Sequence, residues 1–545
     1  MGIKIIRYSN KYADKTIYFY NNFFRNNKRS DLINADDILN INDYYFKTDG
    51  TFLLLIDENK IVGGIGLGIH HKVWMIRRFF LDKKYQHQGF GTKMLKKAIN
   101  FAIEKEIDRI YLGCMFNYKI ANAMYEKNGF QKCDNTIGSS ADFVMCKEMI
   151  PLRIIGGIKK IKTTDSKQLI LNPVENYPFQ CPYSTLFMED YYVSSKIKKD
   201  KNDIIIFSGR ESYTKIMCDI KKIWCNALGA NFIDIKPLSG LNAHIALFLS
   251  LKSFLPNNRC LILSVKAGGH YLSKEIIESL GFEVLETPIK KDSICVDKTK
   301  TMQLINTVRP AVIIIDRSEG LYYEDFSYLK KVDSIKIFDA SQYLADIICD
   351  NRYTNPFDMG FDIIISTTHK NYPGYQKALI FFRDSSLFNL YMTNSKKYYS
   401  SINVRSLFNT TFPIINISEL KKYQTSLCRY EELFISELKK NGLPVFVKNT
   451  GVVQHHIWIS NGDQDNMYEY FKDLEKANIL VNYRLLPYDI GYGLRIGIQN
   501  LVRKNIDEAG IKTIAKWFGD IYKNRNYVEI KKDVERFSKL LKVKN

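Results

Sequence analysis

The stretch IIISTTHK, residues 363–370, begins as a continuous apolar run and ends in a polar turn on Lys370. The stretch IKIFD, residues 335–339, is also mainly apolar and ends on Asp339. The two polar ends are 370 − 339 = 31 residues apart, close to the ~30 residues of one strand–helix–strand step. A lysine at the end of a buried strand loses hydration, so its amine deprotonates readily and can form an imine with an aldehyde. These stretches predict an α/β fold that brings a carboxylate and a reactive lysine to one edge of a sheet.

The same pattern of short apolar runs spaced by helical segments extends over much of the chain. Continuous apolar strands of this kind are typical of a parallel sheet with both faces covered. The expected strands are Ile204–Phe207, Leu261–Val265, Val312–Asp316, Ile335–Asp339, Ile363–Ser366 and Ala378–Phe382. From about Ile415 onward, helices and strands alternate in a way that suits a smaller α+β subdomain.

Three further polar motifs accompany this expected sheet. The segment KPLSGLNA, residues 236–243, predicts a tight turn into a helix whose N–H groups can bind a phosphate. The segment AGGH, residues 267–270, follows a strand and offers an imidazole. The segment GLRIG, residues 493–497, places Arg495 in an apolar strand, and a buried guanidinium needs an anion such as a carboxylate. A pyridoxal-phosphate (PLP) ring requires a carboxylate at its pyridine nitrogen, so Asp339 and Lys370 together predict PLP chemistry.

In their order along the chain, these motifs resemble the serine hydroxymethyltransferase group of aspartate-aminotransferase-like (fold type I) PLP enzymes, over about residues 166–525. The resemblance implies that Lys370 binds the cofactor aldehyde and that Asp339 pairs with the pyridine nitrogen. It also implies that His270 stacks on the ring and that Arg495 binds the carboxylate of an amino-acid substrate. Further cofactor contacts are implied for Ser239, Gly240, Ser318, Gln342, Thr367 and His369.

Two departures from this family bear on the reaction. The family has a glutamate beyond the tyrosine that aligns with Tyr191, a substrate-binding position, and this chain has no acid at that offset. The histidine expected after the aspartate is Gln342, a pattern that cysteine desulfurases share. Three readings therefore stay open. The first is aldol-type or transfer chemistry on a small amino acid, and the second is a desulfurase or β-elimination reaction. Cys349 and Cys428 are the cysteines that such a reaction suggests as a nucleophile, although free cysteines are more often buried and inert. The third, a non-catalytic binding or regulatory protein, has no need of a paired aspartate and lysine.

The N-terminal part of the chain contains a separate phosphate-binding motif. The segment YQHQGFGT, residues 85–92, follows an expected strand at Val73–Leu81 and opens an expected helix at Thr92–Glu104. Glycines there let the backbone approach an anion, which the free N–H groups of the helix start can bind. The residues expected to form this cradle are Gln86, Gln88, Gly89, Phe90, Gly91 and Thr92.

A second motif, NYKIANAMYEKNGF at residues 117–130, lies downstream of the cradle. Together the two motifs resemble the GNAT-type N-acetyltransferases, whose pyrophosphate loop reads Q/R-x-x-G-x-G/A. The resemblance implies that residues 1–150 bind acetyl-CoA, that the backbone of residues 88–92 holds its pyrophosphate, and that Tyr125 protonates the departing thiolate. The strand that often supplies an acid in this family, Met75–Phe80 here, has no carboxylate. The general base and the amine acceptor are therefore unassigned.

These motifs divide the chain into four expected segments. A GNAT-type acetyltransferase domain spans residues 1–150 and a linker spans 151–165. A large PLP-binding domain spans 166–414 and a small C-terminal subdomain spans 415–545. The partners expected are a small amino-acid substrate, an amine substrate and a second copy of the chain, bound through the PLP domain.

The composition of the chain argues against a nucleic-acid-binding, secreted, membrane-spanning or metal-binding protein. The net charge of +21 comes without a long Lys/Arg block or a nucleic-acid-binding signature, so nucleic acid is not an expected partner. The ten cysteines form no CxxC pair, no secretory signal precedes them, and no apolar stretch approaches the ~18–20 residues of a membrane span. The pairs His70-His71 and His455-His456 point to opposite faces of a strand, so no metal site is expected. These features favour a cytoplasmic enzyme.

Overall fold

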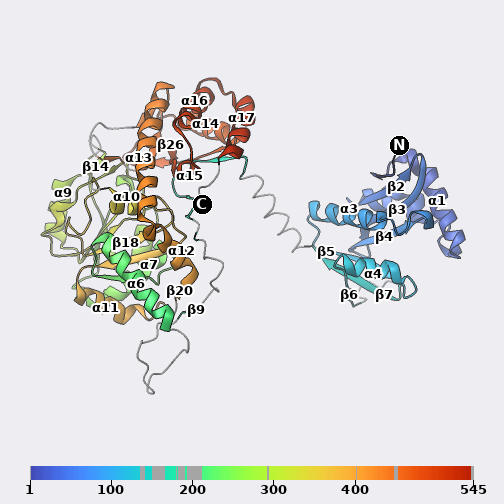
Figure 1. Cartoon of the computed structure of the whole chain (residues 1–545), viewed down its shortest axis with the longest axis horizontal. Helices are drawn as coiled ribbons and strands as arrows, with labels where there is room; N and C mark the ends of the chain where they lie inside the picture. Colours follow the sequence, from blue (N-terminus) through green and yellow to red (C-terminus); the bar gives the residue numbers. More distant parts are fainter. Residues whose placement is uncertain are drawn as a thin grey trace, which may run out of the picture. The chain divides into compact units, whose positions relative to one another are not determined.

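The computed structural model describes residues 2–134, 141–149, 166–179, 181, 191–192, 211–290, 294–350, 352–399, 402–446, 452–453 and 455–541. The chain divides into two compact units, Met1–Thr164 and Asp165–Asn545, each described by itself below (Figure 1). The expected linker at 151–165 and the expected strand at Ile204–Phe207 lie outside the described residues. None of the described helices is long and apolar enough to cross a membrane.

The N-terminal unit is built on a seven-stranded sheet with the order β1-β2-β3-β4-β5-β7-β6. Its strands are β1 (Lys4–Arg7), β2 (Thr51–Asp57), β3 (Lys60–His70), β4 (Val73–Leu81), β5 (Arg109–Cys114), β6 (Gln131–Cys133) and β7 (Phe143–Glu148). Its helices are α1 (Ala13–Asn26), α2 (Asp36–Leu39), α3 (Phe90–Glu104) and α4 (Lys119–Lys127). Neighbouring strands are antiparallel except β4 and β5, which run parallel.

The strand β4 is irregular at the point where it approaches the cradle. Its register against β3 shifts near Arg78, whose φ is +52°, so the strand carries a bulge there. β4 pairs with β5 through Met75 with Tyr111 and Ile76 with Leu112, and it then continues to Leu81. The part of β4 beyond this pairing leads into the segment that holds the predicted phosphate cradle.

The C-terminal unit has a seven-stranded sheet with the order β10-β19-β18-β17-β15-β11-β12. The strands are β10 (Phe232–Asp234), β11 (Arg259–Ile262), β12 (Glu283–Glu286), β15 (Val312–Asp316), β17 (Ile335–Asp339), β18 (Ile363–Thr367) and β19 (Ala378–Phe382). The sequence predicted a parallel sheet, but β19 is antiparallel to both of its neighbours. The connection from β18 to β19 is residues 368–377, which is shorter than the dozen or so residues that a parallel crossover needs.

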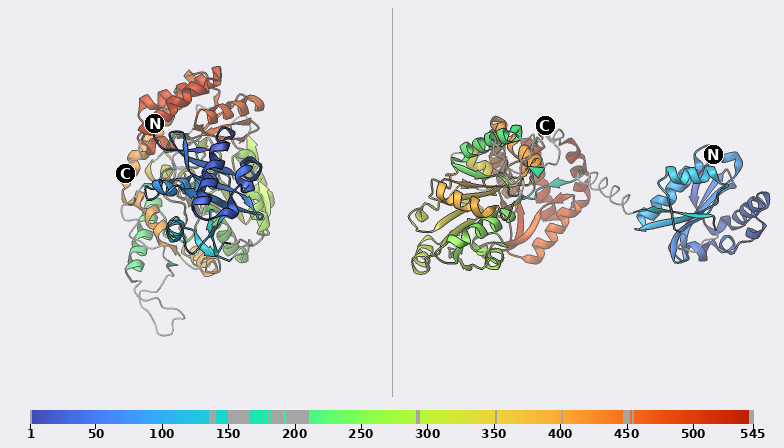
Figure 2. Two further views of the ribbon diagram at one scale, coloured as in Figure 1. Left: turned by 90° about the vertical axis from the view of Figure 1, so that its right-hand side faces the viewer. Right: turned by 90° about the horizontal axis from the view of Figure 1, so that it is seen from below.

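Both faces of this sheet are covered, as the apolar strands predicted. On β15, Val312 and Ile314 pack into one buried cluster with helix α7 (Gly240–Leu251), whereas Ile313 and Ile315 pack into another. Most of the helices of this unit are labelled in Figure 1, and Figure 2 shows the same unit from two further directions. The helices include α6 (Glu211–Leu228), α8 (Ser273–Ser279), α9 (Lys298–Val308), α10 (Leu344–Cys349), α11 (Ser385–Ser395), α12 (Val404–Ile415) and α13 (Ile417–Lys440).

The last part of the chain forms a smaller α+β subdomain, as expected. Its four-stranded sheet has the order β21-β23-β26-β25. The strands are β21 (Val445–Phe446), β23 (Ile457–Ile459), β25 (Asn482–Leu486) and β26 (Gly491–Ile496), and the helices include α14 (Gln464–Lys476), α15 (Gln499–Arg503), α16 (Glu508–Asn524) and α17 (Tyr527–Leu540). Arg495 lies on β26, opposite Trp458 of β23 and Asn482 of β25.

Candidate active sites

The carboxyl ends of β15, β17 and β18 bring the candidate PLP residues together. β15 and β17 pair in parallel with Asp316 opposite Asp339, and Asp339 lies opposite Ile365 of β18. Lys370 follows in the turn after β18, close enough for its charge to act on Asp339. The backbone N–H of Ser341 donates to Oδ1 of Asp339 at 2.8 Å and orients the carboxylate. The two residues that the sequence singled out first are therefore neighbours.

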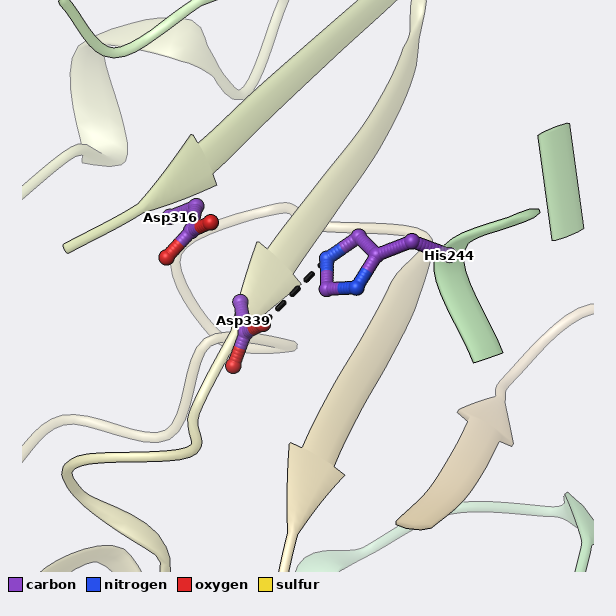
Figure 3. A group of neighbouring side chains, drawn as sticks. All are labelled: His244, Asp316 and Asp339. Carbon is purple, nitrogen blue, oxygen red and sulfur yellow. Dashed lines mark ion pairs between the residues drawn. The ribbon is translucent and has the colours of Figure 1, made fainter. Parts of the chain in front are cut away.

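A histidine that the sequence analysis did not select belongs to this group. His244 lies in the second turn of α7, and its Nε2 is 3.2 Å from Oδ2 of Asp339 (Figure 3). Its Nδ1 lies 2.8 Å from the carbonyl oxygen of Gly240. The available signal was weak, because His244 is an imidazole four residues after the glycine turn within a helix that otherwise reads as apolar core.

The charges around Asp339 set the protonation of both groups. Burial raises the pKa of Asp339, but the pairing with His244 and the charge of Lys370 outweigh it and lower this pKa to about 2. Burial lowers the pKa of His244, but the pairing with Asp339 and the charge of Asp316 raise it to about 9. At neutral pH, Asp339 is therefore a carboxylate and His244 an imidazolium. The possible metal-ligating atoms of His244, Asp316 and Asp339 lie within 4.8 Å of one another, but a protonated imidazole cannot ligate a metal ion.

The start of α7 has the form of a phosphate-binding turn. Ser239 is the N-cap, and its Oγ accepts a hydrogen bond from the backbone N–H of Asn242 at 3.3 Å. A Cβ on Gly240 would lie only 2.7 Å from Cγ2 of Thr367, so the helix start packs closely on the end of β18. The buried Oγ1 of Thr367 has no hydrogen-bond partner among the described residues. A hydroxyl group and a helix N-terminus at one point fit an anion such as a cofactor phosphate.

Gln342 and His369 carry further buried polar atoms. Oε1 of Gln342 and Nδ1 of His369 have no hydrogen-bond partner in the described parts of the chain. Burial, together with the charge of Lys370, lowers the pKa of His369 to about 4, so this imidazole is neutral at pH 7. Leaving a buried polar atom unpaired costs about 1–3 kcal/mol. A bound cofactor would satisfy such atoms, so the residues present here fit PLP.

Ser318 and His270 lie at the same edge of the sheet but make different contacts. Oγ of Ser318 donates to one oxygen of Asp316 at 2.9 Å, and Oγ of Ser273 donates to the other at 2.7 Å. His270 follows β11, which is parallel to β15, so both strands end at one edge. The Nδ1 of His270 accepts a hydrogen bond from the backbone N–H of Leu272 at 3.3 Å. Ser318 thus acts on Asp316, while His270 is held by its own turn.

Arg495 is buried, with an exposed fraction of 4%, but it already has a carboxylate partner. Its Nη1 lies 2.5 Å from Oε2 of Glu319, and its Nε donates to Oδ1 of Asn482 at 3.2 Å. The other oxygen of Glu319 pairs with Arg484. The sequence analysis assigned the anion to a substrate alone. It missed Glu319 because this residue lies 176 positions away and follows a strand of the large sheet.

His455 and His456 are buried, and two charged residues of the site act on both of them. Burial and the charges of Arg495 and Lys370 lower the pKa of His455 to about 3 and lower the pKa of His456 as well. Nε2 of His455 lies 3.3 Å from the carbonyl oxygen of Pro173. Arg495 and Lys370 therefore border the same pair of neutral imidazoles, which the sequence analysis had considered only as an improbable metal site.

Two segments before α6 hold residues that bear on the site, and one of them contacts the lysine turn. The Nδ2 of Asn176 donates to the carbonyl oxygen of Lys370 at 2.8 Å and holds that turn in place. The backbone of Tyr191 forms strand β9 (Tyr191–Tyr192), which pairs with β20 (Ile402–Asn403). The side chain of Tyr191 lies outside the described residues, so its substrate contact stays a prediction.

In the N-terminal unit, the predicted cradle opens helix α3. Gly89 is the N-cap, with a φ of +80° and no side-chain hydrogen bond at that position. A Cβ on Gly89 would meet nothing within 4 Å, so the backbone conformation and not packing favours glycine. The N–H groups of Phe90, Gly91 and Thr92 lack intrahelical acceptors, as at any helix start, and can bind an anion.

The two glutamines of the cradle support the loop. Nε2 of Gln86 donates to the carbonyl oxygen of Leu81 at 2.9 Å, and Nε2 of Gln88 donates to that of Lys84 at 2.8 Å. These side-chain amides hold the segment between β4 and α3 in shape. Ligand contacts at this site would therefore come mainly from the backbone.

Tyr125 and Asp37 lie near the irregular part of β4. The ring of Tyr125, on α4, is 6.2 Å from that of Phe79, and burial raises the pKa of its phenol. Asp37, on α2, accepts from Nη2 of Arg78 at 2.7 Å and lies 3.4 Å from Nη1 of Arg77. Burial raises the pKa of Asp37, but the two arginines outweigh it and lower this pKa. A carboxylate held by two guanidinium groups is a weak base, so Asp37 does not supply the missing proton acceptor.

The fold and the first site define the class: a PLP-dependent enzyme of fold type I, joined to a GNAT-type acetyltransferase domain. A family model for serine hydroxymethyltransferase matches residues 215–518, more than half of the chain, and one for the acetyltransferase (GNAT) family matches residues 18–130. The chain therefore belongs to the serine hydroxymethyltransferase family and carries an N-terminal GNAT domain.

Individual relatives agree with this assignment. A serine hydroxymethyltransferase from Saccharolobus islandicus is 28% identical over 317 residues, covering 55% of this chain and 72% of the relative. One from Sulfolobus acidocaldarius is 26% identical over 326 residues, covering 57% and 75%. The crystal structure of an L-threonine transaldolase from Pseudomonas fluorescens matches with a TM-score of 0.65 and 19% identity, over 72% of this chain and 92% of that chain. This last likeness concerns the fold.

Proposed function

We propose that the chain is a bifunctional enzyme. Its C-terminal unit would use PLP to transform a small amino acid by aldol-type or transfer chemistry, and its N-terminal unit would acetylate an amine with acetyl-CoA. The observation that carries the first part is the position of Lys370. Its charge acts both on Asp339 and on the buried imidazoles of His455 and His456, which Arg495 also borders. A lysine, a carboxylate and a carboxylate-binding arginine thus surround one region.

The residues in this region have distinct roles in the proposal. PLP, when bound, would supply an electrophilic carbon and a ring that accepts electrons. Lys370 would hold the cofactor covalently, and Asp339 would keep a proton on the pyridine nitrogen. The start of α7 and Oγ1 of Thr367 would bind the phosphate. The neutral imidazole of His369 could donate or accept a hydrogen bond next to Lys370.

The charges around Arg495 support a substrate with one carboxylate. Arg495 and Arg484 carry two positive charges, and Glu319 between them carries one negative charge. One positive charge therefore remains, which the carboxylate of an amino acid would neutralise. Glu319 would orient Arg495 and share it with the substrate.

Two observations weigh against the competing readings. Burial raises the pKa of Cys349 and of Cys428 to about 12, so neither thiol is poised as the nucleophile of a desulfurase. The second observation concerns a non-catalytic role. A module that only binds has no need to keep the buried carboxylate of Asp339 ionised next to a lysine, because burying such charges costs free energy.

The second half of the proposal rests on the cradle and on Tyr125. The backbone of residues 88–92 would bind the pyrophosphate of acetyl-CoA. Burial keeps the phenol of Tyr125 protonated because it raises its pKa, so this phenol could give its proton to the departing thiolate. A homodimer formed through the PLP unit and a cytoplasmic location belong to the same proposal and rest on the family. Sedimentation of the full-length protein tests the dimer.

The test uses the full-length protein with PLP and acetyl-CoA. Glycine, serine and threonine should each change the visible absorption of the bound cofactor, and threonine should release acetaldehyde. A panel of small amines should release free thiol from acetyl-CoA. If none of these amino acids changes the cofactor absorption, the proposed substrate class is wrong. If cysteine releases sulfide and alanine, the desulfurase alternative replaces the proposal.

A further inference from the structure

We propose that His244 is a positioning residue that holds Asp339 as an ionised and oriented acceptor for the pyridine nitrogen of PLP. Neither the motifs nor the family match assigns a role to this histidine. The inference rests on the proposed function because it assumes that PLP binds at Asp339. It deepens that proposal by naming the residue that keeps the carboxylate of Asp339 ionised and oriented.

The surroundings of the His244 ring determine its charge. Nδ1 faces the carbonyl oxygen of Gly240 at 2.8 Å, and Nε2 faces Oδ2 of Asp339 at 3.2 Å (Figure 3). A carbonyl oxygen accepts and cannot donate, so Nδ1 carries a proton. Nε2 lies within ion-pair distance of the carboxylate without the alignment of a hydrogen bond, and the negative charge of Asp339 favours a proton on this nitrogen as well. The ring is therefore an imidazolium that spans the start of α7 and the end of β17. The raised pKa of His244 agrees with this geometry.

The need for a positive charge comes from the second carboxylate. Asp316 lies opposite Asp339 on the adjacent strand. The charged groups that face Asp339 are His244 from α7, Asp316 from β15 and Lys370 after β18, and the Ser341 backbone N–H donates to it. Without the imidazolium, two buried carboxylates would stand side by side, a situation in which one takes up a proton. A protonated Asp339 could no longer stabilise a proton on the pyridine nitrogen.

The charges of the group also balance a bound cofactor. Asp316, Asp339 and His244 sum to one negative charge, which the ammonium group of Lys370 balances before the cofactor binds. Once Lys370 holds the cofactor, a protonated pyridine nitrogen would supply the positive charge in its place. Oδ1 of Asp339 accepts from Ser341 and Oδ2 faces His244, and each oxygen can accept a second hydrogen bond. His244 and the pyridine nitrogen therefore need not compete for Asp339.

His244 further links the two ends of the proposed cofactor site. Its contact with Gly240 is made to the turn that would bind the phosphate, and its contact with Asp339 is made at the ring nitrogen. One side chain thus fixes the helix start relative to the carboxylate. A rigid spacing of this kind is what a ligand with two anchored ends requires.

The experiment compares PLP binding by full-length variants between pH 5.5 and pH 8. His244→Gln keeps a donor near Asp339 but removes the charge, whereas His244→Asn keeps the donor near Gly240 and cannot reach Asp339. Ser273→Ala is the matched control, because it removes a hydrogen bond to Asp316 and leaves the His244–Asp339 pair intact. The measured quantity is the ratio of the variant dissociation constant to that of the wild type.

Both histidine variants should bind PLP about tenfold more weakly at pH 8, and the ratio should rise to about 100 at pH 5.5 as Asp339 takes up a proton. The control should stay within about threefold at every pH. A ratio that is constant with pH, or a His244→Asn variant that binds like the wild type, would overturn the role of His244. If His244→Gln fails to fold, the second variant decides. Failure of the wild type itself to bind PLP through Lys370 would instead refute the proposed function.

Discussion

The two candidate sites of this chain are built from different parts of the polypeptide. In the N-terminal unit, the cradle is a helix start with Gly89 at a φ of +80°, and its glutamines brace the loop. In the C-terminal unit, the site consists of buried side chains from α7, β15, β17, β26 and the turn after β18. One site depends on backbone geometry and the other on charges brought together from distant segments.

This difference sets which substitutions each site tolerates. A backbone site loses its shape when a side chain forces the φ angle to change, and most side-chain replacements around it matter little. A side-chain site loses its chemistry when a single charge is removed, because the partner is left buried and unpaired. Four experiments use this contrast.

The largest effect should come from Lys370→Ala. The variant has no amine to bind the cofactor aldehyde, so the visible absorption of the lysine-bound cofactor should disappear completely. Absorption spectra before and after borohydride reduction measure this. Lys266→Ala, an exposed lysine after β11, is the control and should keep the full signal. A reducible absorption that persists without Lys370 would mean that another lysine binds the cofactor.

Gly89→Glu should abolish acetyl-CoA binding by the N-terminal unit, with a loss of at least about 100-fold. The substitution strains a backbone at φ +80° and places a negative charge at the anion site. Gly462→Glu is a matched control, because Gly462 has a φ of +82° and nothing within 4 Å of a Cβ, but lies in the other unit. Calorimetry on the full-length chain should show normal acetyl-CoA affinity for the control. Equal affinity for Gly89→Glu would reduce the cradle to an ordinary turn.

The contrast also explains what the sequence could predict. The cradle could be predicted because its residues are consecutive in the sequence. The bounds predicted for β15, β17 and β19 agree with the structure because each strand is a short, mainly apolar stretch. Lys370 and Asp339 were found because each ends such a run. The antiparallel direction of β19 was not foreseen, since apolar content carries no information on strand direction.

The partners of the predicted residues were largely invisible to sequence reasoning. His244 reaches Asp339 from a helix that reads as apolar core, and Glu319 reaches Arg495 across 176 residues. Sequence patterns indicate which side chain is buried and charged, but the tertiary fold decides what neutralises it. For this reason the burial of Arg495 was anticipated, while the protein carboxylate beside it was not.

Arg495→Lys tests whether this arginine serves a substrate or only Glu319. Lysine keeps the charge but loses the planar pair of donors, so amino-acid binding should weaken by about 2–4 kcal/mol, or roughly 30- to 1000-fold. Arg484→Lys is the control, because Arg484 pairs with the same carboxylate but is more exposed. The measurement is a titration of the PLP-loaded protein with glycine, serine and threonine. Equal, small effects of the two substitutions would show that both arginines merely pair with Glu319.

The smallest effect concerns how the free energy of unfolding depends on pH. It distinguishes the two units because the C-terminal unit contains the buried histidine His455. Burial and nearby positive charges lower the pKa of His455 to about 3, compared with about 6.5 in an unfolded chain. In the unfolded state His455 therefore binds a proton below about pH 6.5, whereas in the folded state it binds one only below about pH 3. The stability of the C-terminal unit is fully present above pH 6.5 and is lost as the pH falls, by about 1.4 kcal/mol per pH unit for this histidine.

His455→Gln should reduce that slope by about the same amount, because glutamine does not titrate. His87→Gln, which replaces an exposed histidine of the N-terminal unit, should leave the slope unchanged. Urea titrations at pH 7.5, 6.5 and 5.5, followed by hydrogen exchange in peptides from β23 and β26, give the free energy of unfolding of the C-terminal unit separately from that of the N-terminal unit. A slope that His455→Gln does not change would mean that His455 can be protonated inside the fold. Protonation of His455 inside the fold would require further anions that balance the positive charges of Lys370 and Arg495. Such anions would take the place of the substrate carboxylate in the proposed site.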